Sequence, residues 1–367
     1  MHSAKLSVLV VDDTVVYRKI LSEVLESIED VQLMGVASHG RLALARMEQS
    51  PADLVLLDVE MPEMGGLETL QHIRKRWPET DVVMVSGTNM SSAEITVQAL
   101  EQGALDFIRK PEGTDPEASR QELRDKLRPL VRHINTRRNM RSPAPSRVEL
   151  PQEKTPPPPP RPALPLGQIE VVGIGVSTGG PNALTEVIPH LPADFPVPVL
   201  VVQHMPPSFT ASLADHLDRR SPLRVCEARE GERIEVGNVY IAPGGKHMVV
   251  RRHEIPGTNT FQRIIGLNEN PPENSCRPSV DVLFRSLAAH YEGSVAAVIM
   301  TGMGNDGCEG VRTLKRRGCR CLTQSAETCV VYGMPMAVDE AGLSDEQVPL
   351  DLLAQRLVRL VRNGGTP

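Results

Sequence analysis

The sequence predicts an α/β protein made of two doubly wound parallel-sheet domains that a proline-rich linker joins. Short runs of Val, Leu and Ile alternate with amphipathic stretches in both halves of the chain. Continuous apolar strands of this kind are typical of parallel sheets covered by helices on both faces. At 367 residues the chain has room for two domains of ordinary size.

The division between the domains is expected in residues 137–167, which carry the proline run Pro156 to Pro160 and almost no periodic apolar pattern. Proline is excluded from helix interiors and central strands, so this segment is expected to be an extended, semi-rigid connector. The expected domains are therefore residues 1–136 and 168–367. A PxxP ligand for a partner module is the alternative interpretation of the same prolines.

The first domain is expected to contain five strand–helix units in order. The expected strands are Leu6–Val11, Val31–Ala37, Leu54–Leu57, Val82–Val85 and Asp106–Ile108. The expected helices are Thr14–Ser27, Gly40–Gln49, Leu67–Arg76, Ala93–Gln102 and Pro116–Arg137. The second domain repeats the alternation, with strands separated by helices at Glu170–Val176, Val197–Gln203, Val239–Ala242 and Val295–Thr301.

The composition argues against several classes of protein. Asp and Glu outnumber Lys and Arg by 46 to 40, and the formal net charge of −6 disfavours a chain that mainly holds nucleic acid. One Trp, four Tyr and five Phe are too few for a platform of stacked bases. The sequence shows no signal peptide and no apolar run of about 18 residues, so we expect a cytoplasmic chain that is not membrane-embedded.

The cysteines all lie in the second half and form no CxxC pair. They therefore lack the usual zinc spacing, and free thiols in a reducing compartment are expected. Their positions are Cys226, Cys276, Cys308, Cys319, Cys321 and Cys329.

Polar side chains follow successive strands of the first domain. Asp12 and Asp13 end the first strand and Asp58 ends the third, so three carboxylates are expected at one edge of the sheet. Carboxylates this close need a cation, and oxygen ligands suit Mg²⁺, which also bridges to phosphate. Ser86 and Lys110, after the fourth and fifth strands, add a hydroxyl and a positive charge. The set predicts phosphoryl transfer onto a carboxylate.

The first domain resembles the receiver domain of two-component response regulators over Leu6 to Arg132. The motifs that carry the resemblance are Val-Asp-Asp, Leu-Asp-Val-Glu-Met-Pro, Val-Ser-Gly-Thr and Arg-Lys-Pro. The resemblance implies a flavodoxin-like fold in which Asp58 accepts a phosphoryl group from a histidine kinase. It implies that Asp13, Asp58 and the backbone carbonyl of Glu60 hold Mg²⁺, with Asp12 acting through water.

The same resemblance implies three switch residues. Ser86 would move toward the phosphoryl oxygens, and Lys110 would pair with them. Phe107 stands where the family carries its switching aromatic.

A glycine-rich turn follows the first strand of the second domain, in the stretch Val171 to Pro181. Gly173 and Gly175 resemble the start of a dinucleotide-binding fingerprint, but Thr178 and the next two glycines do not fit its spacing. A serine at such a strand-to-helix turn is instead held out at the top of the sheet, with backbone N–H groups nearby to stabilise an oxyanion. Ser177 is therefore expected to be a nucleophile.

A serine nucleophile needs a histidine base and an orienting acid. His204 follows the next strand, in Gln-His-Met-Pro, and Asp306 follows a later strand, in Thr-Gly-Met-Gly-Asn-Asp. Asp281, in Arg-Pro-Ser-Val-Asp, is the competing acid. Position alone favours Asp306, because it follows the carboxyl end of a strand.

From about Ile169 to its C-terminus the chain resembles the CheB family of chemotaxis methylesterases. The motifs are Ser-Thr-Gly-Gly-Pro, Gln-His-Met-Pro, Ala-Pro-Gly-Gly-Lys-His, Arg-Pro-Ser-Val-Asp and Thr-Gly-Met-Gly-Asn-Asp-Gly. The resemblance implies a Rossmann-like domain with Ser177 as nucleophile, His204 as general base and Asp306 as its orienting partner. The backbone amide of Met303 would stabilise the oxyanion and Thr178 would help to position substrate.

The family's function is implied by the same resemblance. The substrates would be glutamate methyl esters and glutamines of chemoreceptors, and the catalytic domain would need no metal or cofactor. The unphosphorylated receiver would cover the catalytic cleft until phosphorylation of Asp58 loosens the contact. A receiver joined to a DNA-binding output is the competing class, but no basic helix-turn-helix pattern is visible.

Overall fold

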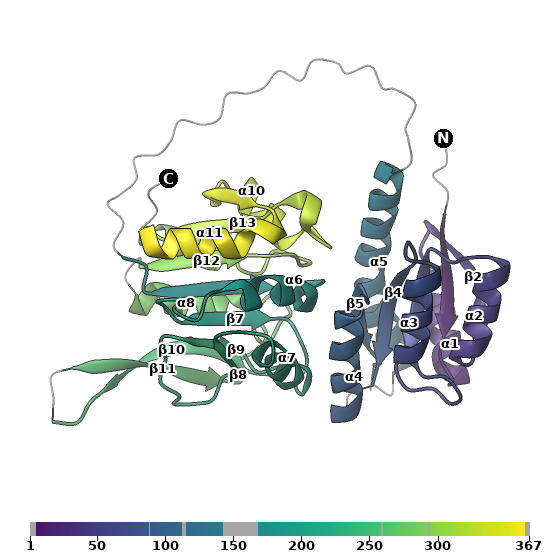
Figure 1. Cartoon of the computed structure of the whole chain (residues 1–367), viewed down its shortest axis with the longest axis horizontal. Coiled ribbons are helices and arrows are strands. Elements are labelled where there is room, and N and C mark those ends of the chain that lie inside the picture. The colour runs from purple at the N-terminus through teal and green to yellow at the C-terminus, as the bar shows by residue number, and fades with distance from the viewer. Residues whose placement is uncertain are drawn as a thin grey trace, which may run out of the picture.

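A computed structural model describes residues 5–87, 89–111, 115–141, 168–257, 260–291 and 294–363. The expected linker lies outside these residues except for 137–141, which continue a helix. The two expected parallel-sheet domains are both present, and the prediction of an α/β fold is confirmed (Figure 1). No helix in the part of the chain that the structure describes combines the length and the apolar character needed to cross a membrane.

The first domain has a parallel five-stranded sheet in the order β2-β1-β3-β4-β5. Its strands are β1 Leu6–Val11, β2 Val31–Ala37, β3 Leu54–Asp58, β4 Asp81–Ser86 and β5 Asp106–Arg109. Its helices are α1 Val15–Glu26, α2 Gly40–Gln49, α3 Gly66–Arg76, α4 Met90–Glu101 and α5 Pro116–Arg141. Apolar residues of α1 and α5 pack on one face, and those of α2, α3 and α4 pack on the other. The strands are buried on both faces, which explains their continuous apolar sequences.

Two helices of the first domain differ from their expected bounds by more than one residue at an end, and the reasons are local. α4 begins three residues early because the Asn89 side chain accepts a 2.7 Å hydrogen bond from the Ser92 N–H and caps the helix. α5 continues beyond Arg137 to Arg141. Its last turns are held by ion pairs of Arg137 with Asp81 and of Arg138 with Asp53.

The second domain has a parallel seven-stranded sheet in the order β14-β13-β12-β6-β7-β9-β8. Its strands are β6 Val171–Val176, β7 Val199–Gln203, β8 Arg224–Glu227, β9 Asn238–Ile241, β12 Val295–Ile299, β13 Arg320–Gln324 and β14 Glu346–Val348. A separate antiparallel hairpin is formed by β10 His247–Glu254 and β11 Phe261–Asn268. The helices are α6 Gly180–Val187, α7 Phe209–Asp218, α8 Val280–His290, α9 Cys308–Lys315, α10 Met334–Glu340 and α11 Leu350–Asn363.

The order of these strands determines where a site can form. β6 lies at the centre, and the chain passes first to β7 on one side and later to β12 on the other. The carboxyl ends of β6 and β12 therefore border a topological switch point, where open parallel sheets bind ligands. α6, α7 and α11 cover one face of the sheet, and α8, α9 and α10 cover the other.

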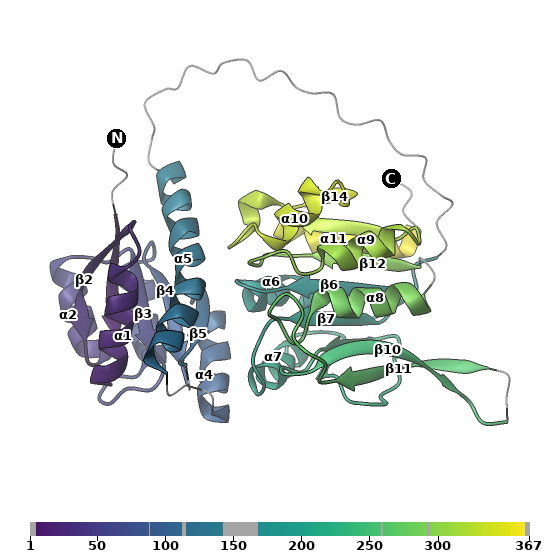
Figure 2. The same ribbon diagram turned by 180° about the vertical axis from the view of Figure 1, so that it is seen from behind.

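The first domain packs through α4 and β5 against α6 and α7 of the second domain (Figures 1 and 2). The ring of Phe107 on β5 stacks on Phe209 of α7, with centroids 4.8 Å apart and planes 8° from parallel. The Asn182 amide of α6 donates a 2.9 Å hydrogen bond to the carbonyl of Ala104. An ion pair of 2.6 Å joins Arg220 to Glu101.

Candidate functional site

The acidic site of the first domain brings together Asp12, Asp13 and Asp58, whose carboxylate oxygens lie within 4.8 Å of one another. Lys110 lies between two of them, with Nζ 2.8 Å from Asp58 Oδ2 and 2.8 Å from Asp12 Oδ2. Burial raises the pKa of Asp58 to about 6, with help from Asp12 and Asp13 and against the effect of Lys110. The cluster thus concentrates negative charge that one lysine does not neutralise.

These carboxylates fit a hard divalent cation by their chemistry, because Mg²⁺ prefers oxygen ligands and keeps several waters. Asp13, Asp58 and Glu60 line a shared cavity of about 300 Å³ with Lys110. The Glu60 side chain is engaged elsewhere, since it accepts a 2.6 Å hydrogen bond from Ser92 Oγ. Because of that contact, Glu60 can offer a bound ion its backbone carbonyl rather than its side chain.

Two expected switch residues do not reach the acidic site. The buried Ser86 hydroxyl accepts a 2.8 Å hydrogen bond from Thr96 Oγ1 and donates to the Gly87 carbonyl at 3.2 Å. Phe107 packs against Phe209 of the second domain instead. In this structure the Ser86 side chain therefore faces α4, and the Phe107 side chain faces the contact with the second domain.

The turn that carries Ser177 follows β6 directly. Its backbone is fixed at both ends, since Ser177 N donates to Thr301 O at 3.0 Å and Gly180 N donates to Ser177 O at 2.8 Å. Gly179 has φ of +73°, a conformation that favours glycine. A Cβ at Gly302 would lie 2.7 Å from Ser177 Cβ, so a glycine is also required where the β12 loop approaches.

His204 lies beside this turn because β6 and β7 pair in register and His204 N donates to Val176 O at 3.2 Å. Its Nε2 is 2.8 Å from Asp306 Oδ2 and its Nδ1 is 3.5 Å from Cys276 Sγ. Burial disfavours the charged ring, but the contacts with Asp306 and Cys276 outweigh it and raise the pKa of His204 to about 9. One ring nitrogen is thus committed to a carboxylate, which stabilises the ring when it carries a second proton.

Asp306 is buried and surrounded by donors. It accepts hydrogen bonds from Ser279 Oγ at 2.9 Å, from Val280 N at 2.7 Å and from Asn274 Nδ2 at 2.9 Å. Burial favours its protonated form, but His204 and these donors hold the pKa of Asp306 well below its usual range. It is therefore an ionised acceptor for the imidazole.

The competing acid, Asp281, does not contact His204. Its carboxylate accepts from Gly310 N at 2.6 Å and from Asn274 Nδ2 at 2.9 Å, on α8 behind Asp306. Burial raises the pKa of Asp281 to about 6. The position beside the imidazole belongs to Asp306.

The remaining expected residues lie around the Ser177 turn. No hydrogen bond joins the Ser177 hydroxyl to His204 among the residues that the structure describes. The Thr178 carbonyl accepts from Thr301 Oγ1 at 2.9 Å. The Met303 N–H has no hydrogen-bond acceptor among the described residues, so it is available to an oxyanion.

Several polar residues of the site were not expected from the sequence. Buried Gln203 donates from Nε2 to Ser177 O at 2.9 Å, and buried Gln324 accepts from Thr301 N at 2.8 Å. Asn274 bridges two carboxylates and Cys276 contacts the imidazole. In the sequence, only their positions beside strand ends or motif residues could have indicated that they belong to the site.

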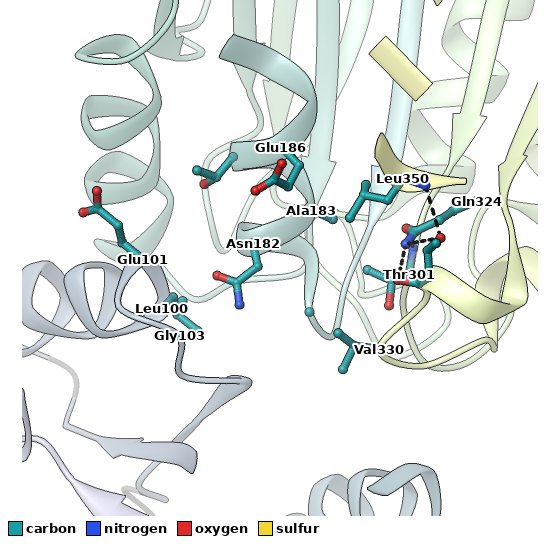
Figure 3. A pocket seen from close by; sticks show the side chains of 13 residues that line it. Leu100, Glu101, Gly103, Asn182, Ala183, Glu186, Thr301, Gln324, Val330 and Leu350 are labelled. Carbon is teal, nitrogen blue, oxygen red and sulfur yellow. Dashed lines mark hydrogen bonds between the residues drawn. The ribbon is translucent and has the colours of Figure 1, made fainter. Parts of the chain in front are cut away.

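A cavity of about 230 Å³ lies between the domains beside the Ser177 turn (Figure 3). Glu101 and Gly103 line it from the first domain, and Asn182, Thr301 and Val330 line it from the second. A second cavity, of about 380 Å³, contains His204 and Cys276 together with Arg109 and Lys126 of the first domain. The docked first domain therefore forms part of the walls around the histidine and the serine turn.

Fold and site together define a two-domain regulatory protein, with an acidic phosphoacceptor-type domain docked on a serine-hydrolase-type domain. The family model described as CheB methylesterase matches residues 172–357, and the model described as response regulator receiver domain matches residues 8–123. The chain belongs to the CheB methylesterase family.

Full-length relatives support this membership. A protein named protein-glutamate methylesterase/protein-glutamine glutaminase from Desulfotalea psychrophila is 43% identical over 97% of this chain and 99% of the relative. One of the same name from Trichodesmium erythraeum is 40% identical over 97% and 99%. The crystal structure of the Thermotoga maritima CheB methylesterase catalytic domain is 43% identical, with a TM-score of 0.50, and covers 52% of this chain and 98% of that one.

Proposed function

We propose that Ser177, His204 and Asp306 carry the activity for which the relatives are named. The chain would hydrolyse glutamate methyl esters of chemoreceptors, releasing methanol, and would deamidate receptor glutamines to glutamate. One observation carries the proposal: the His204–Asp306 contact of 2.8 Å lies at the strand end next to the serine turn. Chemoreceptor signalling helices and their kinase lie in the cytoplasm, which would be the location of this chain.

The ester reaction would begin with attack of Ser177 Oγ on the ester carbonyl. Nε2 of His204 is held by Asp306, so Nδ1 would accept the serine proton. A modest reorientation has to bring the two groups together, as is common between resting and substrate-bound sites. Asp306 keeps its charge throughout and stabilises the imidazolium.

The oxyanion would be stabilised by the Met303 N–H, a contribution of about 3 kcal/mol for one such donor. The imidazolium then protonates the leaving methoxide, methanol departs, and water attacks the acyl-enzyme with His204 again as base. Deamidation follows the same steps with ammonia as the leaving group. Thr178, next to the nucleophile, would help to position the substrate side chain.

The first domain would accept a phosphoryl group on Asp58 from a histidine kinase. Asp13, Asp58 and the Glu60 carbonyl would hold Mg²⁺, with Asp12 acting through water, and the bound ion would neutralise phosphoryl oxygens. Lys110 already contacts Asp58 at 2.8 Å and would pair with the new charge. Ser86 would have to give up Thr96 to reach the phosphoryl group.

Regulation would act through the domain contact. Arg109 and Lys126 stand in the cavity of His204, so a receptor helix reaches the serine only after the first domain moves away. Phosphorylation would favour the separated arrangement by about 1–3 kcal/mol, the usual size of coupling between sites.

The test is methanol release from methylated receptor membranes by Ser177→Ala. We expect a loss of about three orders of magnitude or more, while Asp58 still accepts phosphate from a small phosphodonor. Ser221→Ala is the matched control, because among the described residues that hydroxyl accepts the Leu223 N–H and has no contact with the Ser177 turn. Unchanged methanol release by Ser177→Ala would refute the proposal.

A further inference from the structure

The loop before α8 places a thiol against the catalytic imidazole. Its backbone is fixed on both sides of Cys276: Cys276 N donates to Glu273 O at 2.8 Å, and Gly245 N donates to Arg277 O at 3.0 Å. Cys276 Sγ thereby lies 3.5 Å from His204 Nδ1, within hydrogen-bond distance for sulfur.

This contact involves the nitrogen that catalysis needs. An imidazole has two nitrogens, and Nε2 of His204 is occupied by Asp306. Nδ1 is the one left to take a proton from Ser177. In this structure the thiol stands at that nitrogen, so it has to give way when the serine hydroxyl bonds there.

The thiol also favours the tautomer of the His204 ring that can act as a base at Nδ1. When S–H donates to Nδ1, the ring proton stays on Nε2, pointing to Asp306, and the Nδ1 lone pair faces the cavity. The charged groups around the ring are Asp306 on one side and, in the cavity, Arg109 and Lys126 of the first domain and Arg277 of the loop.

We infer that Cys276 is a positioning residue of the esterase, whose thiol holds His204 with Nδ1 directed at the cleft until the Ser177 hydroxyl replaces it. The inference rests on the proposed function for the role of His204. The reactivity of the Cys276 thiol can be measured without any substrate of the esterase.

The first experiment measures alkylation of Cys276 by iodoacetamide in the full-length protein, with peptide mapping by mass spectrometry. A thiol becomes a strong nucleophile when a neighbouring base takes its proton. Sulfur attacks the methylene carbon as Nδ1 of His204 takes the thiol proton, an S–C bond forms, the C–I bond breaks and iodide leaves. We expect the rate to fall about tenfold or more in His204→Gln at neutral pH.

Cys226 is the internal control. It is half-buried and contacts Glu232 Oε1 at 3.9 Å instead of a histidine, and burial raises the pKa of its thiol to about 11. Its slow rate should be the same in both proteins. Equal rates at Cys276 in wild type and His204→Gln would overturn the inference.

The second experiment compares Cys276→Ala and Cys276→Ser in methanol release. Loss of the thiol should lower kcat about threefold to tenfold with KM unchanged. Cys276→Ser should restore most of kcat, because a hydroxyl also donates to Nδ1. An unchanged kcat in Cys276→Ala would overturn the inference.

The two experiments separate this inference from the proposed function. A wild-type protein that releases no methanol contradicts the esterase assignment, whereas the alkylation result depends only on the thiol–imidazole contact.

Discussion

The stacked contact between Phe107 and Phe209 offers a quantitative test of the proposal that the docked first domain limits the activity of the second domain. Phe209 is buried in the second domain, and Phe107 packs on the same apolar cluster from β5. Their rings are 4.8 Å apart and nearly parallel. Phe107→Ala removes this stacking, which contributes about 0.5–1.5 kcal/mol, and the ring's burial, which contributes about 1 kcal/mol more for a half-buried side chain.

A loss of about 2 kcal/mol in docking increases the separated population about 30-fold. The basal methanol release of the unphosphorylated full-length protein should therefore rise by up to about 30-fold, limited by the rate of the phosphorylated protein. The assay compares both rates for wild type and variant, with thermal unfolding as a check on the fold.

Phe261→Ala is the matched control for this prediction. Phe261 is 45% exposed on β11 and contacts Arg252, and the described residues of this hairpin lie away from the first domain (Figure 2). Its basal rate should equal that of wild type. A folded Phe107→Ala protein whose basal rate stays within about twofold of wild type would refute the reasoning that docking limits activity.

Two further predictions concern buried carboxylates. Asp306→Asn should lower kcat by about 10⁴-fold, because the amide no longer stabilises the imidazolium. Asp281→Asn alters a carboxylate that does not touch His204 and should lower kcat far less. Equal losses of kcat in the two variants would contradict the assignment of Asp306. Burial raises the pKa of Asp58 to about 6, so its contribution to stability is lost as pH rises from about 4 to about 6. Asp58→Asn should thus raise the free energy of unfolding by on the order of 2 kcal/mol near neutral pH, and by less near about pH 4.5. Urea titrations with a chelator present measure this difference. A gain in the free energy of unfolding that does not depend on pH would contradict the prediction.

The sequence predicted most central strands well because their signal is local, although it missed β13 of the second sheet. β1, β3, β6 and β12 are buried on both faces, so nearly every residue in them is apolar. The edge strands β8 and β14 were not predicted, because they are short and carry charged residues. Their strand structure depends on a neighbour that comes from elsewhere in the chain.

In the candidate site, too, the sequence predicted which strand ends meet but not which side chains come into contact. Ser177 and His204 were expected next to each other because parallel strands end at one edge, and register pairing of β6 with β7 places them there. The choice between Asp306 and Asp281 depended on side-chain direction, which the sequence does not encode locally. The Cys276 contact depends on a loop that returns across the cavity from β11, so no spacing rule reveals it.

One strand connects the two candidate sites. Lys110, which contacts Asp58 and Asp12, directly follows β5, and Phe107 and Arg109 on that strand face the second domain. A shift of β5 that lets Lys110 follow a phosphoryl group on Asp58 therefore has to change the contacts of its immediate neighbours with α7 and the His204 cavity. If phosphorylation of Asp58 favours separation of the domains, as proposed, then whatever draws the second domain away from β5 favours the phosphorylated form by the same factor, because coupling between binding equilibria is reciprocal. A receptor segment bound at the Ser177 turn would thus stabilise the state of the first domain that admitted it.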